Sequence, residues 1–315
     1  MVYFGIDIGG TGIKAGVVSP DGKLLYKQSA PTQAALGYDV LAKDIAGLIK
    51  SVMENQNISL DDVAAIGMGC PGSIDDKNGV VIYANNINLK NAPLCAEVRK
   101  YIDKPVYIGN DANCAALGEY FAMNDDSIED FVAVTLGTGV GGGVIINKNI
   151  YTGFNSVAGE LGHTVIAMDG EQCTCGRKGC WEAYASATAL IRDAERAADK
   201  NPDSALAREI AANGGSATGK ITFDCANAGD AVAKEVVDKY IRYVAEGIIN
   251  IVNTFQPQYI AIGGGISNQG DRLLEPVKKY VREGSYGGDL VRPTEIVIAK
   301  LGNDAGIIGA ALLAL

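Results

Sequence analysis

One histidine and three cysteines form the group whose residue types and spacing point most directly to chemistry in this 315-residue sequence. His163, the only histidine, is followed by Cys173, Cys175 and Cys180 in a C-x-C-x4-C pattern that contains two glycines. Zinc prefers four tetrahedral ligands drawn from thiolates and imidazoles, and short cysteine spacings let one tight loop enclose the ion. The set therefore predicts a closed, structural Zn²⁺ site; the alternative is a core histidine beside three unrelated thiols.

Two acidic residues, Glu160 and Glu182, lie on either side of this group in the sequence. A metal ion that holds the loop in place would also fix the direction in which both carboxylates point. The segment from Gly159 to Glu182 thus has the character of a scaffold for a binding site.

Two turns rich in glycine and threonine suggest anion binding. They span Gly9 to Gly12 and Gly137 to Gly143, and each follows a predicted strand. Small residues let backbone N–H groups approach phosphate closely, and threonine adds a hydroxyl donor; ordinary hairpin turns are the alternative. A third turn, Gly263 to Ser267, fits better beneath a nucleoside. The residues predicted to line a nucleotide are Gly9, Gly10, Thr11, Gly12, Gly137, Thr138, Gly139, Gly263, Gly264 and Gly265.

Two other glycine patterns do not fit the motifs that they resemble. The spacing of Gly137, Gly139 and Gly142 matches the dinucleotide fingerprint, but strand-like residues follow where that fingerprint needs a helix. The segment from Gly214 to Lys220 nearly spells a P-loop, but Ile221 replaces the hydroxyl residue that would hold Mg²⁺. We interpret the second segment as a helix end followed by a loop.

Asn110 and Asp111 follow a predicted strand and open a predicted helix. Both residue types are good helix N-caps, which is one interpretation of the pair. The other is that the Asp111 carboxylate accepts a proton from a substrate hydroxyl as a general base. The pair Asn303-Asp304 recurs in a similar context and is expected to act as a cap alone.

The order of strands, turns and helices indicates an internal duplication. The segment from Phe4 to Val18 is echoed by Val132 to Ile146, and Asn110 to Gly118 is echoed by Asn303 to Ala311. Landmarks that recur in one order predict two similar α/β halves with a small-molecule site in a cleft between them. The expected division is 1–117, completed by a C-terminal helix over 304–315, and 118–303. One long helix is expected from Asp224 to Phe255.

Composition limits the classes of function. The net charge of −10 argues against nucleic acid and anionic membranes as partners, and the sequence shows no basic patch. The longest apolar run is too short to span a bilayer, and the first residues lack the basic region of a signal peptide. Seven cysteines, an odd number, favour reduced thiols. We expect a soluble cytoplasmic protein.

These motifs together resemble the ROK sugar kinases, and most closely the bacterial glucokinases of that family. The resemblance runs through DIGGTGIKAGVV, GMGCPGSID, GNDANCAALGE, TLGTGVGGGVI, GELGHTVI, CTCGRKGCWE and NDAGIIGAAL. It implies the actin/hexokinase-like, ribonuclease H-like duplicated two-lobed ATPase fold, which agrees with the duplication. It also implies transfer of a phosphoryl group from MgATP to a hexose hydroxyl, and dimers or higher homo-oligomers are usual among relatives.

The resemblance also implies roles for single residues. Asp111 corresponds to the catalytic base, Asp7 to the carboxylate on the Mg²⁺ side, and Thr11 and Thr138 to hydroxyls of the phosphate loops. Lys14 is placed near the phosphates, with a solvated hairpin lysine as the alternative. His163 would bind zinc through one ring nitrogen and the sugar through the other. The residues matching sugar ligands are Gly72, Asn86, Asn110, Asp111, Glu160, His163 and Glu182.

Two departures from the family pattern leave the substrates open. Gly12 belongs to a GG-[TS]-GIK pattern that also occurs in polyphosphate-using glucokinases, so polyphosphate is an alternative donor. Leu89 replaces a frequent tryptophan, so mannose, fructose, allose or an N-acetylhexosamine are alternatives to glucose. A sugar-sensing repressor is the different class of function; such relatives carry an added helix-turn-helix before the phosphate strand, which here is expected to begin at residue 2.

Overall fold

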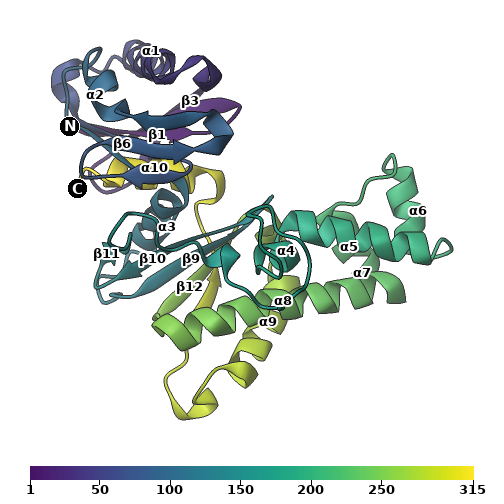
Figure 1. Ribbon diagram of the computed structural model, residues 1–315. Helices are drawn as coiled ribbons and strands as arrows, with labels where there is room; N and C mark the ends of the chain where they lie inside the picture. The colour runs from purple at the N-terminus through teal and green to yellow at the C-terminus, as the bar shows by residue number, and fades with distance from the viewer. The chain divides into compact units, whose positions relative to one another are not determined.

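The chain forms two compact units, which we describe separately. The computed structural model describes residues 1–315, with the exception of the side chain of Ala35. The first unit comprises residues 1–129, 143–159 and 300–315, and the second comprises 130–142 and 160–299. Figure 1 shows the chain coloured along its length. The boundary predicted from the sequence, between residues 117 and 118, remains a prediction.

The main sheet of the first unit brings the ends of three strands together. Its order is β3-β2-β1-β4-β8, with an antiparallel meander followed by parallel neighbours. The register pairs Asp7 with Lys14 on one side and with Gly69 on the other, and it pairs Cys70 with Asn110. The carboxyl ends of β1, β4 and β8 therefore meet at one edge of the sheet, where α/β proteins bind ligands. The elements are β1 Val2–Ile8, β2 Gly12–Val18, β3 Leu24–Pro31, α1 Tyr38–Gln56, β4 Val63–Cys70, β5 Ser73–Asp75, β6 Val80–Ala84, β7 Leu89–Ala92, α2 Leu94–Arg99, β8 Val106–Asn110, α3 Asp111–Phe121, β11 Asn149–Ile150 and α10 Ala305–Leu312.

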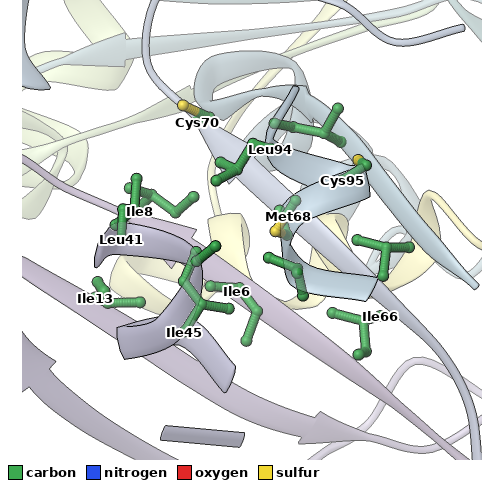
Figure 2. Packing of buried hydrophobic residues seen from close by; sticks show 14 of the residues in the cluster. Ile6, Ile8, Ile13, Leu41, Ile45, Ile66, Met68, Cys70, Leu94 and Cys95 are labelled. Atoms are coloured by element: carbon green, nitrogen blue, oxygen red, sulfur yellow. The ribbon is translucent and has the colours of Figure 1, made fainter. Parts of the chain in front are cut away.

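An aliphatic core covers one face of this sheet. Alternate residues of β1, Ile6 and Ile8, point toward α1, which buries Leu41 and Ile45 one turn apart (Figure 2). The two-residue period of the strand and the four-residue spacing of the helix thus meet on one apolar surface. Met68 of β4 and the helix α2 extend the same cluster.

Glycines bring helix α10 very close to its neighbours in the first unit. A Cβ atom at Gly5 or Gly67 would overlap a carbonyl oxygen of α10, and one at Gly309 would overlap the carbonyl oxygen of Cys114 in α3. Because these positions carry no side chain, the last helix of the chain can lie directly on β1, β4 and α3. The final segment is thereby an integral part of the first unit.

The second five-stranded sheet repeats the order of the first. Its order is β11-β10-β9-β12-β13, which matches β3-β2-β1-β4-β8 position by position, and β12 is parallel to both β9 and β13. This correspondence confirms the duplication predicted from the recurring motifs. The elements are β9 Phe131–Leu136, β10 Val140–Ile146, α4 Glu182–Ala185, α5 Ala187–Lys200, α6 Ala205–Ala212, α7 Gly219–Asn227, α8 Ala231–Phe255, β12 Tyr259–Gly263, α9 Asp271–Gly284 and β13 Glu295–Ile298.

One predicted element was wrong. The expected single helix from Asp224 to Phe255 is two helices, α7 and α8, with a break at Gly229. Gly229 has φ of +94°, which a helix cannot accommodate, and Asp230 caps the second helix by accepting from the N–H of Ala233. As predicted, a strand rather than a helix follows Gly142. The segment from Gly214 to Lys220 was interpreted as a helix end followed by a loop; a loop does follow α6, but α7 already begins at Gly219.

Among the residues that the structure describes, no helix is both long and apolar enough to cross a membrane.

Candidate functional site

The predicted zinc ligands lie together in the second unit. The side-chain ligand atoms of His163, Cys173, Cys175 and Cys180 all lie within 4.8 Å of one another. The sulfur atoms of Cys175 and Cys180 are 3.6 Å apart, close to the roughly 3.7 Å between two thiolates that share a tetrahedral zinc. The donor set and its spacing therefore fit one closed Zn²⁺ site.

The predicted zinc ligands differ in burial and in the pKa of their thiols. Cys180 is buried, and burial raises the pKa of its thiol, whereas the backbone N–H of Arg177 lowers the pKa of the exposed Cys175. The Nδ1 atom of His163 lies 3.7 Å from the sulfur of Cys173. A metal here would bind Nδ1, so that Nε2 carries the proton and is the nitrogen left to donate to a ligand.

The turn between β9 and β10 lies against Glu182. One carboxylate oxygen of Glu182 accepts the N–H of Val140 at 3.0 Å, and the other accepts the hydroxyl of Thr174 at 3.1 Å and lies 3.6 Å from the sulfur of Cys173. A Cβ at Gly139 would overlap this carboxylate. The structure thus brings one predicted phosphate turn, one predicted sugar ligand and the zinc cluster together.

Trp181 anchors the segment that carries Glu182. Its side chain is fully buried, its indole N–H donates to the carbonyl of Tyr243 at 2.8 Å, and its ring fills the space that a side chain at Gly247 of α8 would occupy. A buried tryptophan with a satisfied N–H is a rigid attachment. Glu160 is exposed and precedes the turn of 3₁₀-helix Leu161–His163, where its carbonyl accepts the His163 N–H at 3.1 Å.

The predicted nucleoside turn adjoins the β9–β10 turn. Gly263 ends β12, and a side chain at Gly264, whose φ is +84°, would overlap the backbone of Leu136. A hollow of ≈ 720 Å³ opens beside Gly265. Its walls include three residues that the sequence analysis did not single out, Lys220, Asp224 and Arg272.

These three residues form an ion-paired group. Asp224 accepts from Lys220 at 2.6 Å and from Arg272 at 2.8 Å, and these contacts, that of Lys220 first, lower the pKa of Asp224. Lys220 belongs to the segment from Gly214 to Lys220 that nearly spells a P-loop. The glycines of that segment could have drawn attention to Lys220 in the sequence, whereas no motif marks Arg272 of α9.

In the first unit, Asn110 and Asp111 lie where β8 meets α3. The Asn110 side chain accepts the N–H groups of Ala112 and Asn113 at 2.9 and 3.1 Å, and it donates to the carbonyl of Gly72 at 3.1 Å. Asn110 is therefore the N-cap, and Asp111 is the first helical residue. The Asp111 carboxylate, which was predicted to act as a base, also accepts the N–H of Ala112, through Oδ1 at 2.9 Å.

Two buried thiols lie close to Asp111. Burial, and then the negative charge of Asp111, raise the pKa of Cys70 well above its usual range. The same two causes, followed by the charge of Asp7, raise the pKa of Cys114. These thiols therefore stay neutral near pH 7 and add no negative charge beside the Asp111 carboxylate.

The first phosphate turn closes a separate hollow in the same unit. Gly9 donates its N–H to the carbonyl of Gly12 at 2.8 Å, and a hollow of ≈ 400 Å³ is lined by residues that include Asp7, Thr11 and Lys14. Lys14 is paired with Asp7 at 2.8 Å, so this lysine is held at the turn. Two other predicted residues lie close to each other, because a side chain added at Gly10 would contact the backbone of the exposed Asn86. Gly72, another predicted residue, has a φ of +97°, which favours glycine.

Comparison with known proteins identifies the lineage of the chain. Residues 3–315 match the sequence profile of the ROK family. The chain is 39% identical to a glucokinase of Halalkalibacterium halodurans over 99% of this chain and 94% of that protein, and 37% identical to a glucokinase of Thermotoga maritima over 98% and 95%.

A solved structure supports the same family. A ROK family glucokinase of Streptomyces griseus, in complex with glucose and AMPPNP, is 36% identical and superposes with a TM-score of 0.82 over 99% of both chains. This similarity, with the duplicated sheets, confirms the predicted actin/hexokinase-like two-lobed fold. The chain belongs to the ROK family.

Proposed function

We propose that this protein is an ATP-dependent glucokinase, which transfers the γ-phosphoryl group of ATP to the 6-hydroxyl of glucose. The observation that carries the proposal is the contact between the Glu182 carboxylate, the zinc-ligand cluster and the glycine turn after β9. This contact joins a sugar-binding carboxylate to a phosphate-binding turn. Similarity to glucokinases over nearly the whole chain supports the same activity.

In the proposed reaction, Asp111 takes the proton of the sugar 6-hydroxyl while the oxygen of that hydroxyl attacks the γ-phosphorus. The new O–P bond forms as the bond to the ADP oxygen breaks, and the products are glucose 6-phosphate and ADP. Other backbone N–H groups of the turns Gly9 to Gly12 and Gly137 to Gly139, with the hydroxyls of Thr11 and Thr138, hold the phosphates, while the N–H groups of Gly9 and Gly137 close the turns. Mg²⁺ entering with ATP supplies charge neutralisation, and Asp7 is the carboxylate that would face it.

Sugar specificity comes from fixed hydrogen-bonding groups. The proposed ligands are Gly72, Asn86, Asn110, Asp111, Glu160, His163 and Glu182. Zinc bound to Nδ1 of His163 would hold the ring so that Nε2–H donates to a hydroxyl. A sugar that lacks the matching hydroxyl leaves these groups unpaired, which weakens binding by far more than the loss of an apolar contact.

A coupled assay of ADP release across a panel of hexoses tests this proposal. We expect glucose to give the highest kcat/KM, above mannose, fructose, allose and N-acetylglucosamine, with ATP as donor. Faster turnover of another sugar would change the assigned substrate to that sugar. Use of polyphosphate releases no ADP, so it is measured as glucose 6-phosphate formed without ATP, and efficient formation would change the assigned donor. A protein that phosphorylates none of these sugars would contradict the kinase assignment.

The proposed setting is the cytoplasm, with a homodimer or larger homo-oligomer as the working form. All seven cysteines are unpaired in the part of the chain that the structure describes, which supports a reducing compartment. Light scattering coupled to size exclusion measures the assembly. A monomer at all concentrations tested would contradict the oligomer prediction.

A further inference from the structure

A second hollow lies in the second unit, beside the loop that carries the zinc ligands. It has a volume of ≈ 710 Å³, and its walls come from that loop, from α5 and from α8. None of its lining residues belongs to the sugar, nucleotide or metal groups described above. Its size is within the range of small-molecule sites, which is about 300–1,000 Å³.

The charge of this hollow is opposite to that of the protein. The chain as a whole carries −10, but the lining contains five cationic and three anionic side chains, which leaves two positive charges. Three of the cations, Lys178, Lys200 and Lys239, are exposed at the hollow. The charged lining residues are Lys178, Arg192, Arg196, Lys200, Lys239, Glu171, Asp193 and Glu235.

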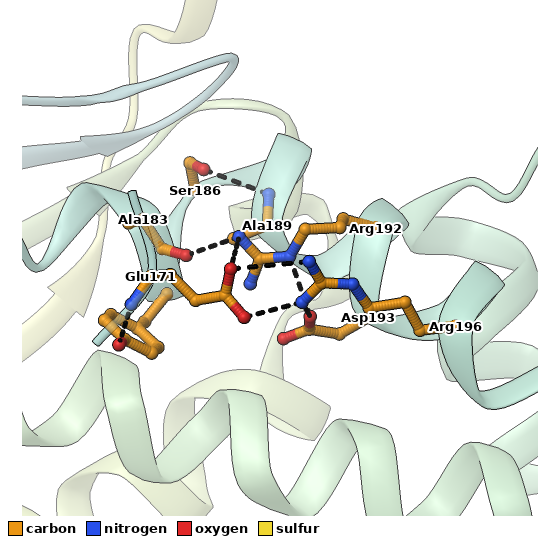
Figure 3. Close-up of polar contacts among 8 residues, drawn as sticks. Glu171, Ala183, Ser186, Ala189, Arg192, Asp193 and Arg196 are labelled. Carbon is orange, nitrogen blue, oxygen red and sulfur yellow. Dashed lines mark hydrogen bonds and ion pairs between the residues drawn. The ribbon is translucent and has the colours of Figure 1, made fainter. Parts of the chain in front are cut away.

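Two arginines are held in place by carboxylates (Figure 3). Arg196 donates to Glu171 at 2.6 Å, and the Nε of Arg192 donates to Asp193 at 2.8 Å. The Nη1 atom of Arg192 donates to the carbonyl of Ala183 at 2.9 Å. The lining cations are therefore partly preorganised before any ligand arrives.

The remaining nitrogen of Arg192 lacks an acceptor. Nη2 is buried, and the residues that the structure describes offer it no hydrogen-bond partner. A buried N–H donor without a partner costs about 1–3 kcal/mol of desolvation, so such donors usually mark a bound group or water. Arg192 lines the hollow, so an anion bound there would lie beside this guanidinium and the lysines around it.

We propose that the hollow is a binding site for a small phosphate monoester. A phosphate monoester carries about −1.5 to −2 charges near neutral pH, which matches the two positive charges left in the lining, whereas a carboxylate carries one. Its three terminal oxygens can accept from an arginine and from lysines at once. The tyrosines of the lining, Tyr184 and Tyr243, lie with their ring centroids 4.6 Å apart and their planes tilted by 47°, and they offer an apolar surface to the organic part.

The site adjoins the zinc loop directly. Glu171, which holds Arg196, lies between His163 and Cys173 in the chain, and its N–H donates to the hydroxyl of Tyr184 at 2.6 Å. A ligand that binds the folded loop stabilises it by mass action. We therefore expect a bound monoester to protect residues 170–180 from amide hydrogen exchange.

The test is calorimetric titration of the full-length, zinc-loaded protein with glycerol 3-phosphate at low salt. The variant Lys178→Gln, Lys200→Gln, Lys239→Gln removes the three lining lysines and leaves the arginine ion pairs intact. We expect it to bind at least about tenfold more weakly, because one charge-assisted hydrogen bond contributes on the order of that factor. The control Lys234→Gln, Lys278→Gln, Lys279→Gln makes the same charge change on α8 and α9 away from the hollow and should bind like the unchanged protein.

Four outcomes would overturn the proposal. They are undetectable binding of glycerol 3-phosphate by the unchanged protein, equal binding by the lining variant, equal weakening in the control, and acetate binding as tightly as the monoester. Thermal melting of each variant without ligand shows that it is folded. Binding is measured without a sugar or nucleotide, so the result is independent of the glucokinase assignment.

Discussion

Asn110 and Asp111 are adjacent in the sequence, yet their side chains have different tasks in the structure. Asn110 accepts two N–H groups at the start of α3 and also donates to Gly72, whereas Asp111 follows it as the first helical residue. Asn110 carries the main capping contacts, whereas the proposed proton transfer would rest on Asp111, which also accepts the N–H of Ala112. Substitutions at the two positions therefore test mainly different tasks.

We expect Asp111→Asn to lower kcat by about 10²–10⁴-fold, because an amide cannot take the proton of the sugar hydroxyl. Its stability should change by less than about 1 kcal/mol, since the charge at the helix N-terminus is lost but the cap remains. The ADP-release assay and urea unfolding measure both quantities. Asp304→Asn, which removes only an exposed pair with Lys27, is the matched control and should retain activity. Normal turnover by the Asp111 variant would exclude the proposed base.

Asn110→Ala should lower the free energy of unfolding by about 1 kcal/mol, because the N–H of Asn113 loses its acceptor and the N–H of Ala112 keeps only Asp111. Urea unfolding of this variant beside Asp111→Asn gives the comparison. An unchanged midpoint would show that solvent replaces the cap without cost.

Helices in this chain are joined by a few polar contacts and by very close glycine packing. Asp230 shows the first kind, because its carboxylate caps α8 at Ala233 and also accepts the N–H of Ala205, the first residue of α6. Burial raises the pKa of Asp230, but the backbone donors, those of Ala233 and Ala205 first, outweigh burial and hold the pKa below its usual value. The ionised form is thus stabilised by folding.

Because its pKa is lowered in the folded state, Asp230 contributes stability above its unfolded pKa of about 3.9 and loses that contribution as the pH falls through the folded pKa. Asp230→Ala should therefore lower the free energy of unfolding by about 1 kcal/mol at pH 7. The difference between the two proteins should shrink below pH 4. Urea unfolding from pH 3 to 7 measures it, and a difference that stays constant with pH would contradict this account.

The contact of α10 with α3 shows the second kind. A methyl group at Gly309 would overlap the carbonyl oxygen of Cys114, so Gly309→Ala should force the helices apart and cost about 1–3 kcal/mol. Gly47→Ala is the matched control, because Gly47 lies inside α1 with nothing within 4 Å of an added Cβ. The control should gain about 0.5–1 kcal/mol. Thermal melting of both variants measures the difference in stability, and equal melting temperatures would contradict the close contact.

Removal of the metal should loosen the zinc loop. Without an ion, four closely spaced donor groups lose their common partner, and structural zinc contributes about 10–16 kcal/mol in small zinc domains. We expect chelation to raise the KM for glucose and to change the fluorescence of Trp181, the only tryptophan, which lies next to Cys180. Zinc added back should restore both. Full activity with an unchanged KM after verified zinc loss would contradict the role of the loop.

The overall charge of the protein bears on its partners. A net charge of −10 repels the phosphate backbone of DNA, so we expect no retention on DNA-cellulose at low salt. Retention would revive the repressor alternative. The positively charged hollow beside α5 and α8 is a local exception, which is why the monoester test compares lysines inside and outside that hollow.

The zinc ligands, both phosphate turns and the duplication follow from local patterns. Cysteine spacing, glycine and threonine in turns, and recurring strand–turn–strand segments depend on neighbours in the sequence. The structure brings the predicted zinc ligands together and repeats the sheet order. Phosphate binding by the two turns stays a prediction. The break at Gly229 was missed because the apolar pattern of a helix continues on both sides of it. The position of Asn110 as the N-cap residue of α3 was not resolved, because either residue of the pair is a good cap.

Other features required the folded chain, since they depend on residues that are far apart in sequence. The contact of Glu182 with the turn at Gly139 joins residues more than forty positions apart, and that of Gly309 with Cys114 joins nearly two hundred. The buried Nη2 of Arg192 and the net positive lining of the hollow are visible only in the folded chain. The spacing of residues along the chain determines which side chains a single turn or loop can bring together. The burial of a residue and the charge of a hollow depend on how separate elements pack, so only the tertiary structure determines them.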